Sequence, residues 1–407
     1  MKILHTLESY LPSRHGMQEV VSQLSEFLVK LGHDVTIATS FDIKRESNFI
    51  NGVKIRDFKI SGNLATGIIG DQNAYLTFLK SEQFDIITNF AAQQWATDLM
   101  LPILSELNAK KVFVPTGFSA LYNSGYSEYF SRMKTWIKGY DASVFLSNDY
   151  RDINFFKENG INGLRLIPNG ASETEFKNVQ YFDIRRLLNV SEKAKLILTV
   201  GSHTGYKGHS EAIKIFEAAK VEDSVLLVIG NVTSSGGRWI RFAKGILNLF
   251  NLKRTNCSLK CCVSSKTFNL LNQNRSIHVR TLSRELTLNA YKQADVFLFP
   301  SLIECSPIVL FEAMAAKTPF LVSDVGNSRE ILAWSDGGEI LPTSFDSDGF
   351  SVVDIDLSAK QLKSLIDDEH KLKSLASNAN KAFMDNFTWE KIAYRYEELY
   401  NELLNDE

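Results

Sequence analysis

The sequence lacks the features that mark membrane-spanning and secreted proteins. No stretch approaches the roughly 18 consecutive apolar residues that a membrane-spanning helix needs. The apolar run at residues 2–7 is too short for a signal peptide, and we expect it to form a first buried strand. The 4 cysteines are too few and too clustered for a disulfide framework, which fits a reducing cytoplasm. We therefore expect a cytoplasmic protein.

An excess of charge and several cofactor motifs are also missing. A net charge of -2 gives no argument for nucleic acid or a membrane as the partner of the whole chain. The loop after the first strand has one glycine and no G-x-G-x-x-G, so we expect no nicotinamide dinucleotide there. A second glycine-containing loop, residues 201–209, does not have the spacing of a Walker A loop. Cys257, Cys261 and Cys262 have no partner set of the zinc-finger kind, so we expect no zinc site.

What the chain has instead is the composition and pattern of a two-domain α/β protein. Its 407 residues exceed one ordinary domain, and a hydrophobic content of 44% with 23% charged residues is typical of a globular protein with a sizeable core. Apolar strands alternate with amphipathic helices from the unit at residues 2–39 onward, which predicts Rossmann-like parallel sheets. The turn sequence at residues 168–170 marks the hinge, and we expect the boundary near residues 171–190.

The second half of the chain is organised around residues 296–315. Four apolar residues at 296–299 predict a buried parallel strand that ends at Pro300. Ser306 is expected to cap the following helix, with Pro307 as its first residue, because the N–H that proline lacks would be unsatisfied there in any case. The sequence thus predicts a strand, a loop and a helix start in close succession.

Two carboxylates stand on either side of this helix start. Glu304 is expected on the loop, and Glu312 in the second turn of the helix, leaning back toward the loop. The free N–H groups of Ile308 and Val309 lie between them at the positive end of the helix dipole, which favours an anion such as phosphate. Two carboxylates that accept hydrogen bonds from hydroxyls on either side of a diphosphate match the groups of a nucleotide-sugar. The plainer alternative is a surface helix with one exposed glutamate and a second glutamate on a loop.

The loop at residues 201–209 follows another predicted buried strand and opens another helix. Backbone N–H groups and the ammonium of Lys207 converge in such a loop, which suits a phosphate. A lone Lys-Gly pair is usually a solvated turn. The two carboxylates further along the chain favour the phosphate role.

These features together resemble a known family. The spacing Glu304-x7-Glu312 after an apolar strand ending in Pro-Ser, followed by Glu-Ala-Met-Ala, resembles the hallmark of the retaining GT-B-fold glycosyltransferases of family 4, also called glycosyltransferase group 1. The Pro-Asn-Gly at residues 168–170 is also similar to the family, and the resemblance covers nearly the whole chain.

The resemblance implies an α/β fold of GT-B architecture, with two Rossmann-like domains whose parallel sheets face a central cleft. We place the N-terminal, acceptor-side domain at residues 1–175, with the C-terminal helix 387–407 packing back on it. The C-terminal domain, at residues 190–386, is expected to bind the nucleotide-sugar.

The same resemblance implies an activity and a set of site residues. The activity is that of a retaining hexosyltransferase that moves a sugar from a UDP- or GDP-sugar to a glycan or lipid-linked saccharide in cell-surface polysaccharide synthesis, with no cofactor and no required metal. Catalytic roles fall to Glu304 and Lys207. Donor-binding roles fall to residues of three loops and one helix: Glu312, Ser202, Ser306, Ile308, Val309 and Gly16. Acceptor-side roles fall to four residues of the first domain: His15, Thr116, Gly117 and Phe118.

The sequence departs from the family pattern at three places. His15-Gly16 stands where the family usually has Gly-Gly, and the loop at residues 115–119 lacks the histidine thought to touch the transferred sugar. Ser202 stands where most relatives have an arginine, so one cation for the diphosphate is missing. Two alternatives therefore stay open beside the transferase. One is a GT-B-fold sugar-nucleotide epimerase, which would release a free sugar, and the other is a non-catalytic partner protein.

Residues 231–284 contain many basic residues and no acidic one, and we predict that they form an insertion in the second domain. Within them, residues 238–250 place apolar and basic side chains at helical spacing. Such a helix can lie on an anionic membrane surface, which would put the protein at the inner membrane face, or it can pack on its own domain with its charges solvated. No recognition fold accompanies the charges, so we expect no nucleic acid.

Overall fold

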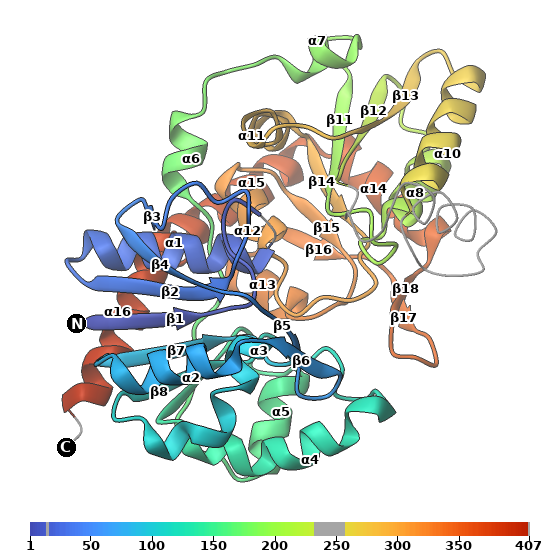
Figure 1. The fold of residues 1–407 in the computed structure, drawn as a ribbon. Coiled ribbons are helices and arrows are strands. Elements are labelled where there is room, and N and C mark those ends of the chain that lie inside the picture. The colour runs from blue at the N-terminus through green and yellow to red at the C-terminus, as the bar shows by residue number, and fades with distance from the viewer. Residues whose placement is uncertain (14–15, 232–256, 406–407) are drawn as a thin grey trace. The chain divides into compact units, whose positions relative to one another are not determined.

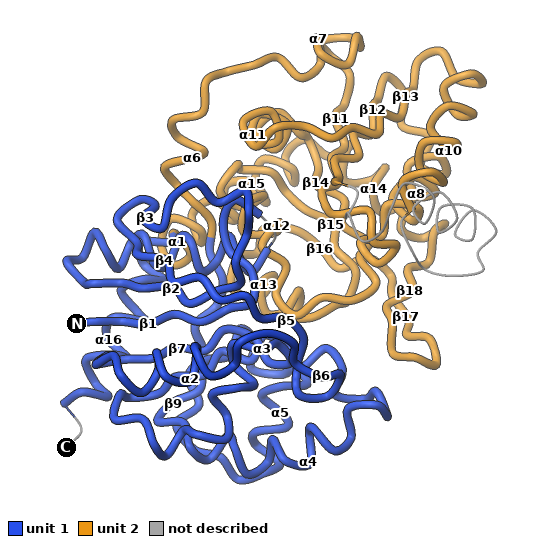
Figure 2. The backbone as a smooth tube through the Cα atoms, viewed as in Figure 1, with its two compact units in different colours: residues 1–170, 389–407 blue, residues 171–388 orange. Residues whose placement is uncertain are grey.

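The computed structural model describes residues 1–13, 16–231 and 257–405. The chain divides into two compact units, unit 1 with residues 1–170 and 389–407, and unit 2 with residues 171–388 (Figure 2). Residues 176–189, which the sequence left between the two expected domains, are part of unit 2.

Unit 1 is built on one eight-stranded sheet in which only the edge strand β3 runs antiparallel to its neighbour (Figure 1). The strands are largely apolar because helices cover both faces of the sheet. In spatial order they are β10 (Leu164–Leu166), β9 (Ala142–Phe145), β8 (Lys110–Val114), β7 (Ile86–Phe90), β1 (Lys2–Thr6), β2 (Asp34–Ser40), β4 (Val53–Phe58) and β3 (Phe49–Ile50). A separate antiparallel hairpin is formed by β5 (Ile60–Asn63) and β6 (Gly67–Gly70).

Two hydrophobic cores lie on the two faces of this sheet. One is formed with α1 and α16, which pack against each other, and the other with α2, α4 and α5 (Figure 1). The helices of unit 1 are α1 (Gly16–Lys30), α2 (Gln72–Ser81), α3 (Trp95–Asp98), α4 (Ser127–Trp136), α5 (Arg151–Glu158) and α16 (Trp389–Asn405). The described part of unit 1 also has three short 3-10 helices, at Leu101–Glu106, Ser124–Tyr126 and Ile137–Gly139.

A buried histidine in β1 makes unit 1 sensitive to acid. His5 is fully buried, its Nδ1 lies 2.8 Å from Ser25 Oγ and its Nε2 lies 3.3 Å from Tyr400 OH, so it bridges α1 and α16. Burial lowers the pKa of His5 to about 3. Between pH 3 and the unfolded pKa of about 6.5, the unfolded chain binds a proton at His5 that the folded chain does not. The contribution of neutral, buried His5 to the unfolding free energy is therefore fully present above pH 6.5 and is lost as the pH falls toward 3.

We expect His5→Gln to flatten this acid dependence. Relative to the variant, the wild type should lose roughly 1.4 kcal/mol of unfolding free energy per pH unit below pH 6.5. Denaturant titrations of both proteins between pH 7 and pH 4.5 would measure the difference. The comparison must use the difference, because burial raises the pKa of Asp98 and of Asp152 to about 6, which acts in the opposite direction. Parallel pH profiles for the two proteins would contradict the assignment to His5.

Unit 2 is built on a six-stranded sheet in which all strands are parallel. In spatial order they are β13 (Arg275–Arg280), β12 (Ser224–Ile229), β11 (Lys195–Val200), β14 (Val296–Phe299), β15 (Phe320–Val322) and β16 (Gly338–Ile340). A hairpin is formed by β17 (Thr343–Phe345) and β18 (Ser351–Val353). The prediction of two Rossmann-like α/β units with parallel sheets is therefore confirmed.

Helices cover both faces of the second sheet as well. Helices α11, α12, α13 and the second half of α15 enclose one core, and α8, α10 and α14 enclose the other (Figure 1). The described helices of unit 2 are α6 (Glu173–Asn178), α7 (Ile184–Leu188), α8 (His209–Ala219), α10 (Ser258–Leu271), α11 (Arg284–Gln293), α12 (Ile308–Ala315), α13 (Ser328–Ser335), α14 (Ile355–Asp367) and α15 (Glu369–Asn386).

The prediction of a basic insertion is wrong for residues 257–284. These residues form α10 and β13, and β13 pairs with β12 along its whole length as the edge of the sheet. The basic residues of this stretch resembled a surface insertion in the sequence, but Arg275 of β13 is buried and donates to the carbonyl of Phe216 on α8. The predicted helix at residues 238–250 lies outside the described residues.

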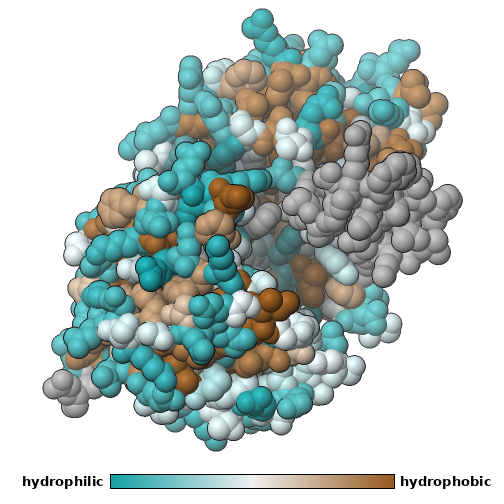
Figure 3. Space-filling model, viewed as in Figure 1, coloured by the Kyte–Doolittle hydropathy of each residue, from teal (hydrophilic) through white to brown (hydrophobic). Residues whose placement is uncertain are grey.

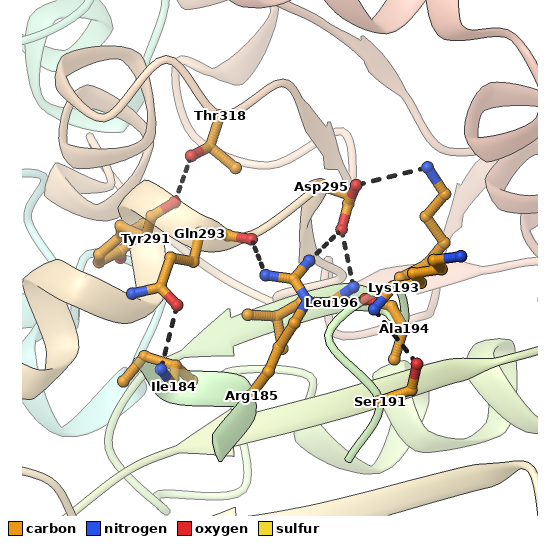
Figure 4. A network of polar contacts seen from close by, with 11 residues as sticks. Ile184, Arg185, Ser191, Lys193, Ala194, Leu196, Tyr291, Gln293, Asp295 and Thr318 are labelled. Atoms are coloured by element: carbon orange, nitrogen blue, oxygen red, sulfur yellow. Dashed lines mark hydrogen bonds and ion pairs between the residues drawn. The ribbon is translucent and has the colours of Figure 1, made fainter. Parts of the chain in front are cut away.

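A polar network fixes the start of β14 beside β11. Arg185, on α7, donates from Nε to the carbonyl of Ala194 at 2.8 Å and from Nη2 to Asp295 Oδ2 at 2.9 Å (Figure 4). Asp295 Oδ2 also accepts from the backbone N–H of Leu196 at 2.8 Å. Because Asp295 directly precedes β14 and Leu196 lies in β11, the network aligns the two strands that carry the candidate site at their other ends.

One face of the molecule has an ordinary mixed surface. On the face drawn in Figure 3, apolar side chains occur in small groups among polar ones, as on most folded proteins. Among the described helices, none combines the length and the apolarity needed to cross a bilayer.

Candidate active site

Two loops meet at the carboxyl ends of the adjacent strands β11 and β14 (Figure 1). The first, residues 201–208, joins β11 to α8, and the second, residues 300–307, joins β14 to α12. The carbonyl of Tyr206 in the first loop accepts from the backbone N–H of Leu302 at 2.8 Å and from Ser301 Oγ at 3.0 Å in the second. In open parallel sheets, ligands bind outside the carboxyl ends of the strands, so this pair of loops is the natural place for a site.

A glycine allows the two loops to come this close. Gly208 has φ +71°, and a Cβ atom at this position would lie 1.9 Å from the carbonyl oxygen of Pro300. Both the backbone conformation and the contact therefore exclude a side chain. Gly208 is also the N-cap residue of α8, so the first loop turns into its helix directly against the second.

The two predicted catalytic residues are in contact across these loops. Lys207 Nζ lies 2.6 Å from Glu304 Oε1, which also accepts from Ser301 Oγ at 2.9 Å. The Glu304 side chain is 10% exposed and the Lys207 side chain 31% exposed. An ammonium and a carboxylate are thus held at one partly shielded position, where each can still reach a ligand.

The helix after the second loop starts one residue later than predicted. Its N-cap is Pro307 and its first residue is Ile308, so the prediction that Ser306 caps the helix is wrong. The hydroxyl of Ser306 instead accepts from Asn327 Nδ2 at 3.1 Å. Ile308 and Val309 remain in the first turn, where N–H groups have no partner within the helix, as predicted for an anion site.

Glu312 lies in the second turn of α12 and is paired with an arginine that the sequence did not indicate as a site residue. Glu312 is 5% exposed, and Arg284 Nη1 donates to its Oε1. Arg284 Nη2 donates to Glu175 Oε2 at 2.7 Å, so one guanidinium holds two carboxylates from different helices. In the sequence, Arg284 was noted only as the last residue of the stretch 231–284, which has no acidic residue. That position did not indicate the partners of the guanidinium.

The other predicted donor residues lie at their expected loops. Ser202 is half-buried in the first loop, and its carbonyl accepts from the backbone N–H of Thr204 at 2.7 Å in a tight turn. Gly16 is the first residue of α1 in unit 1. His15 lies outside the described residues.

The predicted acceptor-side loop of unit 1 has a strained backbone. Thr116, Gly117 and Phe118 all have positive φ, at 57°, 101° and 46°. The buried carboxylate of Asp152 accepts from the N–H of Gly117 at 2.7 Å and stabilises this conformation. The prediction for Phe118 needs correction, because its side chain is 1% exposed and packs in the core against Phe130 and other aromatic rings.

One further group of side chains in unit 2 has the composition of a metal site. His203, His209, Cys257 and Cys261 are all buried, and their ligand atoms lie within 4.8 Å of one another. From the sequence we expected no zinc site, because no partner residues of the zinc-finger kind lie near the cysteines in the chain. His203 lies in the loop that carries Lys207, and His209 is the first residue of α8.

The family comparison matches the second unit. Residues 181–382 match the family described as Glycosyl transferases group 1. The chain is 23% identical over 392 residues to an uncharacterised glycosyltransferase of Methanocaldococcus jannaschii, covering 91% of this chain and 90% of that protein. It is 24% identical over 262 residues to the lipopolysaccharide 1,2-N-acetylglucosaminetransferase of Salmonella typhimurium, covering 63% and 61%.

Solved structures are similar along the whole chain. The sucrose-phosphate synthase of Thermosynechococcus elongatus superimposes with a TM-score of 0.73 at 17% identity and full coverage of both chains. The Anabaena protein HepE, in complex with UDP and glucose, superimposes with a TM-score of 0.72 at 13% identity, covering 99% of this chain and 100% of that one. The fold is therefore that of the GT-B glycosyltransferases, and residues 181–382 are similar to the group 1 family.

Proposed function

We propose that this chain, a glycosyltransferase by its GT-B fold and its similarity to the group 1 family, moves a hexosyl group from a nucleoside-diphosphate sugar to an acceptor hydroxyl with retention of the anomeric configuration. In this reaction the bond between the anomeric carbon and the phosphate oxygen breaks, and a bond to the acceptor oxygen forms on the same face of the sugar. The observation that carries the proposal is the contact between Lys207 and Glu304 at the carboxyl ends of adjacent strands, beside the first turn of α12.

The diphosphate is proposed to bind at Lys207 and at the N–H groups of Ile308 and Val309. It carries more negative charge than one carboxylate, so it competes with Glu304 for the Lys207 ammonium. As the bond to the sugar breaks, negative charge grows on the leaving phosphate, and a fixed ammonium and a helix dipole stabilise that charge. Positive charge on these groups supplies what a metal ion supplies elsewhere, so we propose that the transfer needs no metal at this position.

Glu304 is proposed to face the sugar once the diphosphate has engaged Lys207. Its carboxylate then accepts hydrogen bonds from sugar hydroxyls and stabilises the positive charge of an oxocarbenium-like transition state. Before the donor binds, Glu304 holds Lys207 in place, since the two side chains are in contact. We assign no general base from the protein, and propose that the departing phosphate oxygen takes the proton of the acceptor hydroxyl.

Glu312 is proposed to bind the ribose of the nucleotide from the second turn of α12. Arg284 fixes its orientation, because the guanidinium holds the carboxylate at Oε1. This division of roles puts the sugar and the ribose on opposite sides of the diphosphate. For the base and the sugar, we propose a UDP- or GDP-sugar. The similarity to HepE, which was solved with UDP and glucose, supports the first of these.

For the acceptor we propose a glycan or a lipid-linked saccharide in cell-surface polysaccharide synthesis. The support is the similarity to a Salmonella protein named for transfer of N-acetylglucosamine to lipopolysaccharide. A family 4 enzyme of this kind would work in the cytoplasm, with a peripheral contact to the inner membrane face through residues 238–250.

The donor and the role of Glu312 can be tested by calorimetric titration of UDP and GDP into the wild type and Glu312→Gln. We expect about 10-fold weaker binding or more in the variant, because a hydrogen bond to a charged group contributes about 1.5–3 kcal/mol. Glu369→Gln, which changes an exposed glutamate at the start of α15, is the matched control and should bind as the wild type does. Equal affinities of all three proteins would remove Glu312 from the donor site.

The reaction itself distinguishes the three candidate functions. A panel of UDP-, GDP- and ADP-sugars that raise the melting temperature identifies the donor, because a ligand that binds the folded state stabilises it. A transferase should then hydrolyse that donor slowly to a nucleoside diphosphate and transfer the sugar when given acceptors. An epimerase would instead release an epimerised free sugar with no acceptor, and a non-catalytic partner would bind the donor and leave it intact.

A further inference from the structure

A buried cluster of two histidines and two cysteines joins two helices of unit 2 at their N-termini. His209 is the first residue of α8, and Cys257 and Cys261 lie at the N-cap and in the first turns of α10. His203 comes from the loop before α8. The four side chains are between 0% and 4% exposed.

Three ligand atoms of this cluster are spaced much as in a tetrahedral zinc site, and all four lie within 4.8 Å of one another. His203 Nδ1 lies 3.0 Å from His209 Nδ1 and 3.3 Å from Cys257 Sγ, and Cys257 Sγ lies 3.8 Å from His209 Nδ1. Zn–N bonds of about 2.05 Å and Zn–S bonds of about 2.3 Å at tetrahedral angles place two nitrogens roughly 3.3 Å apart and a nitrogen and a sulfur roughly 3.6 Å apart. The atoms of His203, His209 and Cys257 therefore need only small adjustments to bind one zinc ion, and Cys261 Sγ is near enough to complete the set.

The cluster is poorly satisfied by its own hydrogen bonds. Two Nδ1 atoms that face each other can share only one proton, and the buried Nε2 of His209 has no hydrogen-bond partner within the described residues. Buried polar groups that lack partners are costly and uncommon. A divalent cation bound at both Nδ1 atoms removes the conflict between them, because both nitrogens then offer lone pairs and two thiolates neutralise the charge. His209 Nε2 then carries the proton of its ring.

We propose that His203, His209, Cys257 and Cys261 form a structural zinc site that ties the loop carrying Lys207 to helix α10. Two nitrogens and two sulfurs in a tetrahedron are the ligand set of zinc, whereas calcium and magnesium require oxygen ligands. All four ligands come from the protein and all are buried, which leaves no open position for a substrate, so the ion is structural. The site does not depend on the proposed function.

The surrounding backbone leaves room for these rings. Gly230 follows β12, and a Cβ atom there would lie 3.0 Å from the ring of His203. A Cβ atom on Gly201 would lie 3.4 Å from His209 Nε2. The two histidines bracket Lys207 along the chain, so a metal bound to both would fix the backbone on either side of that lysine.

Metal analysis of the full-length chain, purified with a non-thiol reductant and incubated with zinc, tests the site. We expect one zinc per chain in the wild type and in Cys262→Ser, whose cysteine lies next to the ligands on α10 and outside the group of four. Cys257→Ser and Cys261→Ser should lose the bound zinc. Substitution by cobalt should give the visible spectrum of a tetrahedral cobalt thiolate in the wild type, which reports the ligands without requiring any variant to fold.

A chelator provides a second readout with an internal control. It should lower the melting temperature of the wild type and of Cys262→Ser, and leave that of Cys257→Ser unchanged. The proposal is overturned if the wild type retains no zinc after this incubation, if it prefers iron or copper, or if Cys262→Ser loses the metal as fully as Cys257→Ser. Mass spectrometry showing a disulfide between Cys257 and Cys261 in the purified protein would also overturn it.

Discussion

Lys207→Met is expected to lower kcat for sugar transfer by about 10²–10³, the loss seen when one fixed donor to a developing negative charge is removed. The physical reason is that the leaving phosphate gains charge only as its bond to the sugar breaks. An ammonium placed at that point stabilises the transition state more than it stabilises the bound donor. The effect should therefore fall mainly on kcat, with a smaller rise in KM.

Steady-state kinetics with the identified donor and acceptor would measure this split. Lys214→Met is the matched control, because Lys214 is exposed on α8, the helix that follows the same loop, and should keep wild-type rates. Melting temperatures of both variants would show that unit 2 is folded. A Lys207→Met enzyme with unchanged kcat and raised KM would mean that the lysine only binds the donor, and unchanged values of both would remove it from the site.

The sequence was sufficient to locate the strands that carry the site. Buried parallel strands are nearly continuous apolar runs, so residues 296–299 could be recognised without any tertiary information. The loops that follow such strands lie at one edge of the sheet, which is why Lys207 and Glu304 could be assigned to one site although 97 positions separate them. Such reasoning does not predict that the side chains of Lys207 and Glu304 form an ion pair.

The sequence was insufficient where a side chain depends on a distant partner. Ser306 has the right residue type for an N-cap, but Asn327 engages its hydroxyl and the helix begins after Pro307. Phe118 lies in the predicted acceptor-side loop, yet its ring packs in the core formed with α2, α4 and α5. Local propensity does not include either contact, because Asn327 and the rings that surround Phe118 belong to other elements of the chain.

Arg284 is the clearest case of this kind, and it gives the largest expected effect on stability. It was visible only as one basic residue among many, whereas the structure places its guanidinium between Glu312 and Glu175. Glu312 is nearly inaccessible to water, and Arg284 donates a hydrogen bond to its carboxylate. Removing one partner of a buried ion pair leaves the other charge uncompensated, which typically costs about 3–5 kcal/mol.

We therefore expect Arg284→Met to reduce the unfolding free energy of unit 2 by about 3 kcal/mol, at the lower end of that range because the Arg284 side chain is 33% exposed. The double variant Arg284→Met/Glu312→Leu should recover most of the loss, because no charge then remains buried. Denaturant unfolding would measure both, with Arg329→Met as the control. Arg329 pairs with Asp324 but is 69% exposed, so its loss should cost less than about 1 kcal/mol. A loss of unfolding free energy in Arg284→Met no larger than that in Arg329→Met would mean that water reaches Glu312 in solution. Arg284 would then not be the group that orients the carboxylate proposed to bind ribose.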